Sequence, residues 1–193
     1  QCPEKELTMA REHMVFSFQA AAKAGNYDEQ PMLPDDVDLQ VHLSRNNRQQ
    51  PFWLICEHDT LITTLSGEGT VEFKDAPVLR HTYKTGDYIY VPAGTPTRIL
   101  PEKRSVQYRY KAADAGLEGV AWYCEKCGRE LYREVWDTAD ELSQVAYQRI
   151  TVEFNANSNR RKCKGCGKVH PKVDMRGLGW GKLARELSKS LAA

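Results

Sequence analysis

Short stretches of alternating apolar and polar residues recur between Val37 and Lys111. Glycine- and proline-containing turns, such as Gly67-Glu68-Gly69 and Pro92-Ala93-Gly94, separate them. A period of two is typical of half-buried strands, and no helical pattern intervenes. The pattern therefore predicts a mainly β fold built as an antiparallel sandwich or barrel. The predicted strands are DLQVHL, PFWLICE, TLITTL, GTVEF, VLRHTY, DYIYV, TRIL and SVQYRY.

Two flanking segments have the pattern of helices. Residues 12–24 are rich in alanine and end before Gly25, which predicts an N-terminal helix. Apolar residues at 180, 183, 184, 187 and 191 predict a short amphipathic helix from Trp180 to Leu191 that docks on another part of the protein. Residues 112–121 are mostly small, and we expect a connector there.

The 193 residues fit one domain of ordinary size with a small appendage. We expect three parts. Residues 1–36 form a helical extension, residues 37–115 form the barrel, and residues 116–193 form a cysteine-containing module with a basic C-terminal helix.

The formal net charge of +1 is the sum of two unequal parts. Residues 160–193 contain ten Lys and Arg against two acids, whereas the rest of the chain contains 17 bases against 24 acids. A basic tail could contact nucleic acid or a membrane. Since charge runs are mostly solvated, we instead expect the tail to pack on its own acidic body or on a partner subunit. No apolar run approaches the ~18–20 residues of a membrane span, so we expect a cytoplasmic protein.

Four cysteines form two matching Cys-x-x-Cys-Gly motifs, at Cys124 and Cys127 and at Cys163 and Cys166. Two thiolates at this spacing can bind one ion, and the following glycine permits a tight turn. Together the motifs predict a tetrahedral site for one zinc or iron ion, which has no open position and is therefore structural. Two disulfides are the alternative, which a reducing compartment disfavours. Between the motifs, ELYREVW and QRITVEF predict two strands.

Longer motifs extend the pattern on both sides of the cysteines. They are Trp122-Tyr123-Cys124-x-x-Cys127-Gly128 and Arg161-Lys162-Cys163-x-x-Cys166-Gly167-Lys168-Val169-His170-Pro171. Upstream, the turn Leu65-Ser66-Gly67-Glu68-Gly69 and the motif Gly86-x5-Pro92-x-Gly94-x2-Thr97 have the spacing of the two cupin motifs. From about Asp38 to Pro171 the chain resembles the bacterial 3-hydroxyanthranilate 3,4-dioxygenases. This resemblance implies a cupin double-stranded β-helix barrel, a rubredoxin-like metal module, short flanking helices and a homodimer.

The resemblance also implies Fe(II) in the barrel, held by two histidines and a carboxylate. At those positions this chain has Leu54, Thr60 and Thr97. An isobutyl group and two hydroxyls cannot replace imidazole and carboxylate, so we predict no iron in the barrel. The family's substrate-binding residues differ too: Gln50 and Pro101 stand where it has two carboxylate-binding arginines, and Arg109 where it has a pocket glutamate.

Strand alternation places Cys56, Thr60, Thr97 and Arg109 inside the predicted barrel. A buried Arg109 needs either an internal acid or an anionic ligand such as an aromatic carboxylate, and the sequence leaves both open. Arg98 should point outward because it alternates with Thr97. The candidate substrate-binding residues are Arg109, Arg98, Arg48, Gln50, Thr97 and Thr60.

Three residues are candidates for catalysis. Cys56 could be a nucleophile if His58 favoured its thiolate, although lone buried cysteines usually act as apolar filler. His42 alternates with Gln40 and could be a general base, although a structural histidine is the more common case.

Three functions fit these residues. The first is an enzyme that converts a small aromatic amino or hydroxylamino acid without barrel iron, by rearrangement, lyase or isomerase chemistry. The second is a ring-cleaving dioxygenase that uses unorthodox ligands such as His42, His58 or Cys56. The third is a non-catalytic ligand-binding or interaction protein.

Overall fold

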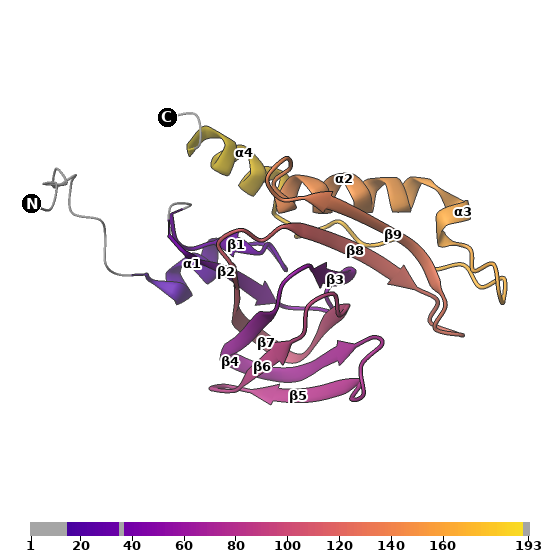
Figure 1. The fold of residues 1–193 in the computed structure, drawn as a ribbon, viewed down its shortest axis with the longest axis horizontal. Helices are drawn as coiled ribbons and strands as arrows, with labels where there is room; N and C mark the ends of the chain where they lie inside the picture. Colours follow the sequence, from indigo (N-terminus) through magenta and orange to yellow (C-terminus); the bar gives the residue numbers. More distant parts are fainter. Residues whose placement is uncertain (1–14, 35–36, 191–193) are drawn as a thin grey trace, which may run out of the picture.

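The computed structural model describes residues 15–34 and 37–190, and Figure 1 shows its mainly β architecture. The helices are α1 (Ser17–Lys23), α2 (Ser143–Ala156), α3 (Ser158–Arg161) and α4 (Trp180–Ser190). The strands are β1 (Gln30–Pro31), β2 (Leu39–Asn46), β3 (Trp53–Cys56), β4 (Thr60–Phe73), β5 (Arg80–Lys84), β6 (Tyr88–Val91), β7 (Thr97–Ala112), β8 (Leu117–Tyr123) and β9 (Glu130–Asp137).

One antiparallel sheet curls to form the barrel. Its strands run in the order β1-β2-β7-β3-β8-β9, and β4 pairs with β5, β6 and β7. The β8–β9 hairpin projects from the barrel, and α2 lies along it (Figure 1). The predicted mainly β fold of the cupin class, with a four-cysteine module behind it, is confirmed.

Two pairs of predicted strands are in fact continuous strands. TLITTL and GTVEF are halves of β4, and TRIL and SVQYRY are halves of β7. Register shifts between Thr64 and Gly69 let β4 bend while it stays paired with β7. Gly67 adopts φ 86°, and a Cβ there would lie 2.4 Å from the Arg104 carbonyl oxygen, so the bend requires glycine.

The alternation predicted for the barrel strands is confirmed. Thr60, Ile62 and Thr64 are buried on one face of β4, whereas the intervening side chains are partly exposed. Leu54 and Cys56 lie in the main apolar core, and Thr97, Ile99, Gln107 and Arg109 are buried along β7.

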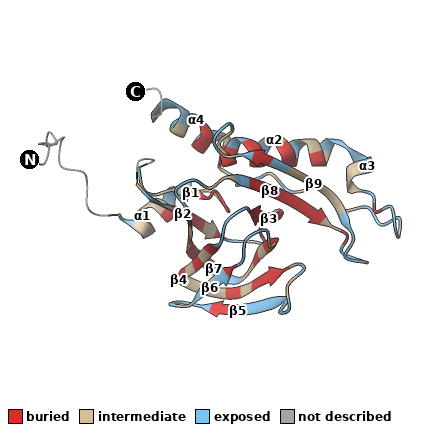
Figure 2. Ribbon diagram, viewed as in Figure 1, coloured by how far each residue is buried: buried red, intermediate tan, exposed pale blue. Residues whose placement is uncertain are grey.

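The prediction of a strand at QRITVEF is wrong, because these residues belong to helix α2. The β-branched residues suggested a strand, but Tyr147, Ile150 and Phe154 recur at helical spacing and are fully buried. In Figure 2 the buried positions of α2 face the β8–β9 hairpin. There Phe154 stacks on Trp122, with ring centroids 4.1 Å apart. Burial of this aromatic face outweighs the local preference for a strand.

The connector predicted at residues 112–121 is also wrong in part. Only the first residues connect, and β8 begins at Leu117 and pairs with β3 and β9. A Cβ at Gly119 would lie 3.1 Å from the Val135 side chain, so a larger residue there would push that neighbour aside. Small residues therefore reflect close strand packing here rather than a loop.

The two predicted flanking helices are present where the structure describes them. The N-terminal helix spans Ser17–Lys23 and is shorter than the predicted residues 12–24. Val15, Phe16 and Ala24 are not helical, and the part predicted before Val15 lies outside the described residues. The C-terminal helix spans Trp180–Ser190, and the predicted end at Leu191 lies outside them. Trp180 is 1% exposed, and its indole Nε1 donates to the Tyr27 carbonyl, so α4 docks on the chain's own body.

The division into three domains stays a prediction. Its boundary after residue 115 falls in the turn between β7 and β8, and the sheet continues through β3 into β8. No described helix is both long and apolar enough to cross a membrane.

Candidate functional site

The four predicted metal-binding cysteines lie together at the end of the β8–β9 hairpin. Their Sγ atoms are all within 4.8 Å of one another. Cys124 Sγ lies 3.4 Å from Cys166 Sγ, and Cys127 Sγ lies 3.5 Å from Cys163 Sγ. Tetrahedral zinc with Zn–S bonds of ~2.3 Å needs sulfur atoms about 3.8 Å apart. The donor set therefore fits a metal ion.

Both cysteine motifs fold into the same turn. Gly128 N–H donates to the Cys124 carbonyl at 2.8 Å, and Gly167 N–H donates to the Cys163 carbonyl at 2.9 Å. Both glycines adopt positive φ, at 72° and 73°. We call each of these cysteine turns a knuckle. In each knuckle, backbone N–H groups point at the Sγ atom of the first cysteine, which is Cys124 or Cys163. These hydrogen bonds lower the pKa of Cys163 to about 6, the backbone of Cys166 contributing most. The folded backbone thus favours the thiolate form of Cys124 and Cys163, the first cysteine of each motif.

The three residues at the family's iron-ligand positions are buried in the barrel. Leu54 and Thr97 face each other across β3 and β7, and both are 1% exposed. Thr60 accepts a hydrogen bond from Arg109 Nη1 at 3.1 Å. Over residues 15–34 and 37–190, the four cysteines are the one group of three or more His, Cys, Asp or Glu side chains close enough to share an ion. The residues at the iron position do not fit ferrous iron.

A network of buried charges occupies the barrel interior beside this position. Lys111 Nζ lies 2.8 Å from Glu29 Oε2 and 2.7 Å from Glu118 Oε1. Arg109 Nε lies 3.3 Å from Glu29 Oε1. All four side chains are at most 3% exposed. Two cations and two carboxylates balance each other, as buried charges require.

Elements far apart in sequence supply this network. Arg109 and Lys111 are two residues apart on β7, so both point inward, and Glu118 comes from β8. Glu29 comes from the segment before β1, where Tyr27 and Glu29 both adopt φ 51°. Left-handed backbone at such residues costs about 1 kcal/mol or more, so surrounding contacts must hold it. Gln144 Nε2 donates to the Glu29 carbonyl at 2.6 Å and is one of those contacts.

Helix α2 closes the network from the other side. Ser143 Oγ donates to Glu118 Oε2 at 2.8 Å, and the Tyr147 hydroxyl donates to the same oxygen at 3.4 Å. Arg109 Nη2 and the Tyr27 hydroxyl are buried, and they have no hydrogen-bond partner among the described residues.

Burial and neighbouring charge shift the pKa values of the network in opposite directions. Burial alone would raise the pKa of Glu29, but Lys111 and Arg109 outweigh it and lower that pKa to about 2. Burial lowers the pKa of His42 to about 4, helped by Lys111 and opposed by Glu29. At neutral pH Glu29 is therefore ionised and His42 is neutral.

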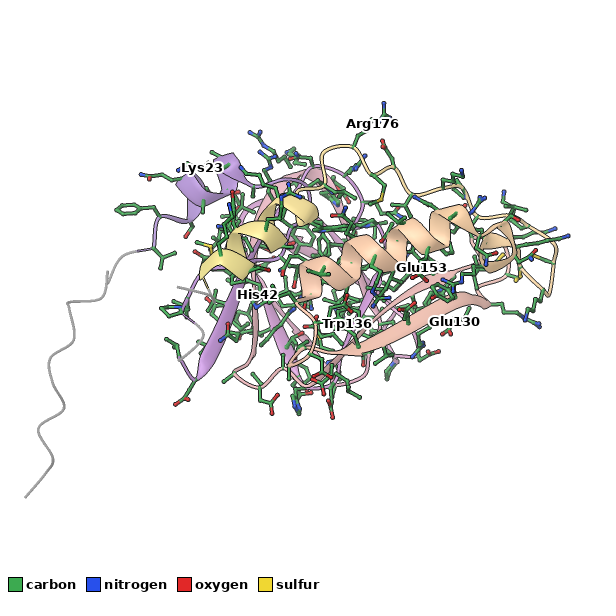
Figure 3. The ribbon with its side chains drawn as sticks, turned by 90° about the horizontal axis from the view of Figure 1, so that it is seen from above. Lys23, His42, Glu130, Trp136, Glu153 and Arg176 are labelled. Carbon is green, nitrogen blue, oxygen red and sulfur yellow. The ribbon has the colours of Figure 1, made fainter. Side chains whose placement is uncertain are left out.

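A pocket of about 370 Å³, open to solvent, lies against the network. His42, Glu118, Ser143 and Gln144 line it. The other lining residues are Pro31, Gln40, Ala113, Asp114, Ala115, Thr138, Ala139 and Leu142. His42 Nδ1 lies 3.9 Å from Glu29 Oε2. In Figure 3, His42 and Glu130 lie toward opposite ends of α2, so this pocket is well separated from the start of β9. It has the size of a small-molecule site.

The other two catalytic candidates are placed less favourably. Burial raises the pKa of Cys56 to about 12, so this side chain is a thiol at neutral pH and not a nucleophilic thiolate. His58 is exposed at the outer end of a narrow crevice that Cys56, Thr60, Lys111 and Glu118 also line. The crevice is too narrow to admit a substrate.

The structure brings only some of the candidate substrate-binding residues together. Gln50 is buried, and its Oε1 accepts from Ile99 N–H at 3.1 Å, which ties two barrel segments together. Thr97 is 1% exposed and lies 3.5 Å from the Leu54 carbonyl. Arg48 points away from the interior and lies 2.9 Å from Asp174. Arg98 points outward, as expected, and pairs with Glu72 at 2.6 Å.

Sequence reasoning missed Glu29, Lys111, Glu118, Ser143 and Tyr147. Lys111 could have been found, since it shares the inward face of β7 with Arg109. Two inward cations would then have required two buried acids. Nothing local marks Glu29, because its position depends on the α4 and α2 contacts made by its segment.

Comparisons with known proteins confirm the resemblance. A 3-hydroxyanthranilate 3,4-dioxygenase of Bacillus thuringiensis (strain Al Hakam) is 30% identical over 142 residues, or 71% of this chain and 77% of the relative. The enzyme of that name from Jannaschia sp. (strain CCS1) is 28% identical over 72% of this chain and 79% of the relative. A solved hydroquinone 1,2-dioxygenase PnpCD has a TM-score of 0.46 and 20% identity over 55% of this chain and 77% of that one. No protein-family model matches. On its identity and coverage, the chain belongs to the 3-hydroxyanthranilate 3,4-dioxygenase family.

Proposed function

We propose that this member of the family binds a small aromatic amino or hydroxylamino acid and converts it without iron in the barrel. The supporting observation is the donor set: Leu54, Thr60 and Thr97 stand at the iron-ligand positions, and a charge network stands beside them. The chemistry left to such a barrel is proton transfer, which serves rearrangement, lyase and isomerase reactions.

The pocket beside His42 is the proposed site of the reaction. A neutral imidazole can accept a proton from a ligand, and His42 Nδ1 has no hydrogen-bond partner among the described residues. The imidazolium that forms lies close to the Glu29 carboxylate, which stabilises it. His42 is therefore the general base of this proposal, and Glu29 positions it.

Charged groups behind the pocket orient the ligand. Arg109 Nη2 and the Tyr27 hydroxyl are two of the buried donors that have no hydrogen-bond partner among the described residues, and we assign them to ligand oxygens. A carboxylate accepts such bonds well, and a guanidinium binds it with defined geometry. Cys56 and His58 have no step in this mechanism.

The cysteine site has a supporting role in this proposal. Cys124, Cys127, Cys163 and Cys166 would hold one zinc or iron ion, which supplies a closed structural crosslink. That crosslink joins the end of β8 to the segment after α3 and so holds α2 along the hairpin. Ser143 and Tyr147 of α2 in turn hold Glu118.

The test is incubation of the purified protein with a panel of aminobenzoates and hydroxylaminobenzoates, with products identified by mass spectrometry. We expect turnover that added Fe(II) does not increase, and loss of about 100-fold or more in the His42→Gln variant. The His81→Gln variant is the matched control, since His81 lies on β5 outside the pocket. Oxygen uptake with 3-hydroxyanthranilate that depends on Fe(II) would instead support the dioxygenase with unorthodox ligands.

A non-catalytic binding protein is the second candidate. The closed pairing of Glu29, Lys111 and Glu118 favours it, because a fully paired network has little free chemistry. A ligand-dependent rise in melting temperature without turnover would support this candidate. A homodimer and a cytoplasmic location remain predictions, and light scattering tests the first of them.

A further inference from the structure

We propose a second ligand site, separate from the barrel interior, in the pocket between the barrel wall and the first cysteine knuckle. Its ligand is a small planar carboxylate. The pocket holds about 290 Å³ and opens to solvent. Its lining includes Trp53, Tyr123, Lys74, Arg80, Arg98 and Glu72.

Strand alternation separates this pocket from the proposed reaction site. Leu54 of β3 points into the main core, whereas Trp53 points to the opposite face and packs with Ile55 and Ala121. The pocket on that face shares no lining residue with the pocket at His42. The two sites can therefore be changed independently.

Two aromatic rings form one wall of the pocket. Trp53 and Tyr123 meet edge to face, with centroids 5.6 Å apart. Lys74 Nζ lies 5.0 Å from the Trp53 centroid and 5.1 Å from the Tyr123 centroid. The Arg98 guanidinium lies 4.6 Å from the Trp53 centroid. The rings thus hold two cations at the pocket while offering apolar surface to a planar group.

The cations of this pocket exceed its available acids. Glu72 is shared, since Arg98 lies 2.6 Å and Arg80 lies 2.9 Å from its two oxygens. Glu125, the other acid of the wall, is exposed. Among the described residues, Lys74 forms no ion pair with a carboxylate. One ammonium held in place by two rings is therefore left to bind an anion.

The chemistry of the wall selects the ligand class. A carboxylate can accept hydrogen bonds from Lys74 and from the outer face of the arginines. An attached aromatic ring can pack on Trp53 or Tyr123, which an inorganic anion cannot do. The volume, at the lower end for ligand sites, suits a single ring. Benzoate is accordingly the simplest probe.

The experiment titrates the protein with benzoate and follows the tryptophan indole resonances by NMR, with Trp53 assigned from a Trp53→Phe spectrum. Benzamide, with the same ring and no charge, and cyclohexanecarboxylate, with the same charge and no planar ring, are the comparison probes. We expect benzoate to shift the Trp53 resonance, and both comparison probes to bind at least about tenfold more weakly.

Variants separate this site from the reaction site. Lys74→Met keeps the alkyl stem over the rings, and we expect it to weaken benzoate binding about tenfold or more. Lys84→Met removes an exposed charge at the other end of β5, and His42→Gln alters the reaction site; neither should change the shift at Trp53. Equal binding to wild type and Lys74→Met, or a Trp53 shift lost in His42→Gln, overturns the proposal.

Discussion

Lys111 donates a hydrogen bond to Glu118 inside the barrel, with Nζ 2.7 Å from Oε1. The same ammonium lies 2.8 Å from Glu29 Oε2, so one cation joins two carboxylates from distant segments. All three side chains are at most 2% exposed. The contact therefore links the segment before β1 to strands β7 and β8 through side chains that are almost fully buried.

Removal of this ammonium should destabilise the protein strongly. Lys111→Met leaves Glu29 and Glu118 buried with only Arg109 as a cation, and we expect a loss of about 3–5 kcal/mol in the free energy of unfolding. Urea denaturation measures it. Lys84→Met is the control at an exposed position, and its free energy of unfolding should lie within about 0.5 kcal/mol of the wild-type value.

The double variant Lys111→Met/Glu118→Gln tests the coupling between the two charges. It removes one charge of each sign, so its loss should be smaller than the sum of the single losses. Additive losses would show that the two side chains act independently, which the 2.7 Å contact contradicts.

Stability should depend on pH through His42. The unfolded pKa of about 6.5 exceeds the folded value of about 4, so the unfolded state binds more protons between them. Stability from the neutral imidazole is full above pH 6.5 and falls as pH drops toward 4. We expect the urea midpoint of the His42→Gln variant to change less with pH between 4 and 6.5 than that of the wild type. An equal pH dependence in both proteins would exclude His42 as its source.

Glu29 should cause a separate loss of folding stability at lower pH. Its folded pKa of about 2 lies below the ordinary value of 4.5, so its stabilisation is present above pH 4.5 and lost as pH falls toward 2. Glu29→Gln should lack this second decline, and thermal unfolding from pH 5 to pH 2 measures it. A decline of unchanged size in that variant would assign it to other carboxylates.

Loss of the metal site should weaken the packing of α2 on the β8–β9 hairpin. Cys163→Ser breaks the ligand set, and we expect a fall in Tm of roughly 5–10 °C together with faster proteolysis after β9. Lys164→Ser, an exposed neighbour in the same knuckle, is the control. The absorbance spectrum identifies the ion, since ferric thiolate sites are coloured and zinc sites are not. A wild-type Tm in Cys163→Ser contradicts a structural role.

The C-terminal helix should be needed for stability. Trp180 contacts Phe52 and Tyr147 and donates to the Tyr27 carbonyl at 2.8 Å. Trp180→Ala should cost about 3–5 kcal/mol in urea denaturation. Val152→Ala, at a 50% exposed position of α2, should cost far less. Similar losses in both would mean that α4 does not close the core.

The sequence predicted those parts of the fold whose cause is local. Alternation along β4 and β7 depends on neighbouring residues, and so do the two cysteine turns with their glycines. The prediction failed at residues 148–154, where β-branched residues suggested a strand. Packing of Phe154 on Trp122 is a tertiary contact that a local pattern does not contain.

The sequence predicted which side chains of the candidate site point into the barrel, but it did not predict which residues they bind. Arg109 was expected to need an internal acid or an anionic ligand, and the acid is Glu29, 80 residues earlier in the chain. Arg48 was expected at a ligand, but it binds Asp174 on the surface. Such pairings depend on how the segment before β1 and the tail close over the barrel.

Metal analysis tests most directly the claim that the barrel works without iron. The protein is incubated with Fe(II) under anaerobic conditions, desalted and analysed by plasma mass spectrometry, in the wild-type and Cys163→Ser forms. The donor sets predict about one ion per chain in the wild type and none in Cys163→Ser. A second ion in the wild type, or iron retained by Cys163→Ser, would contradict the account.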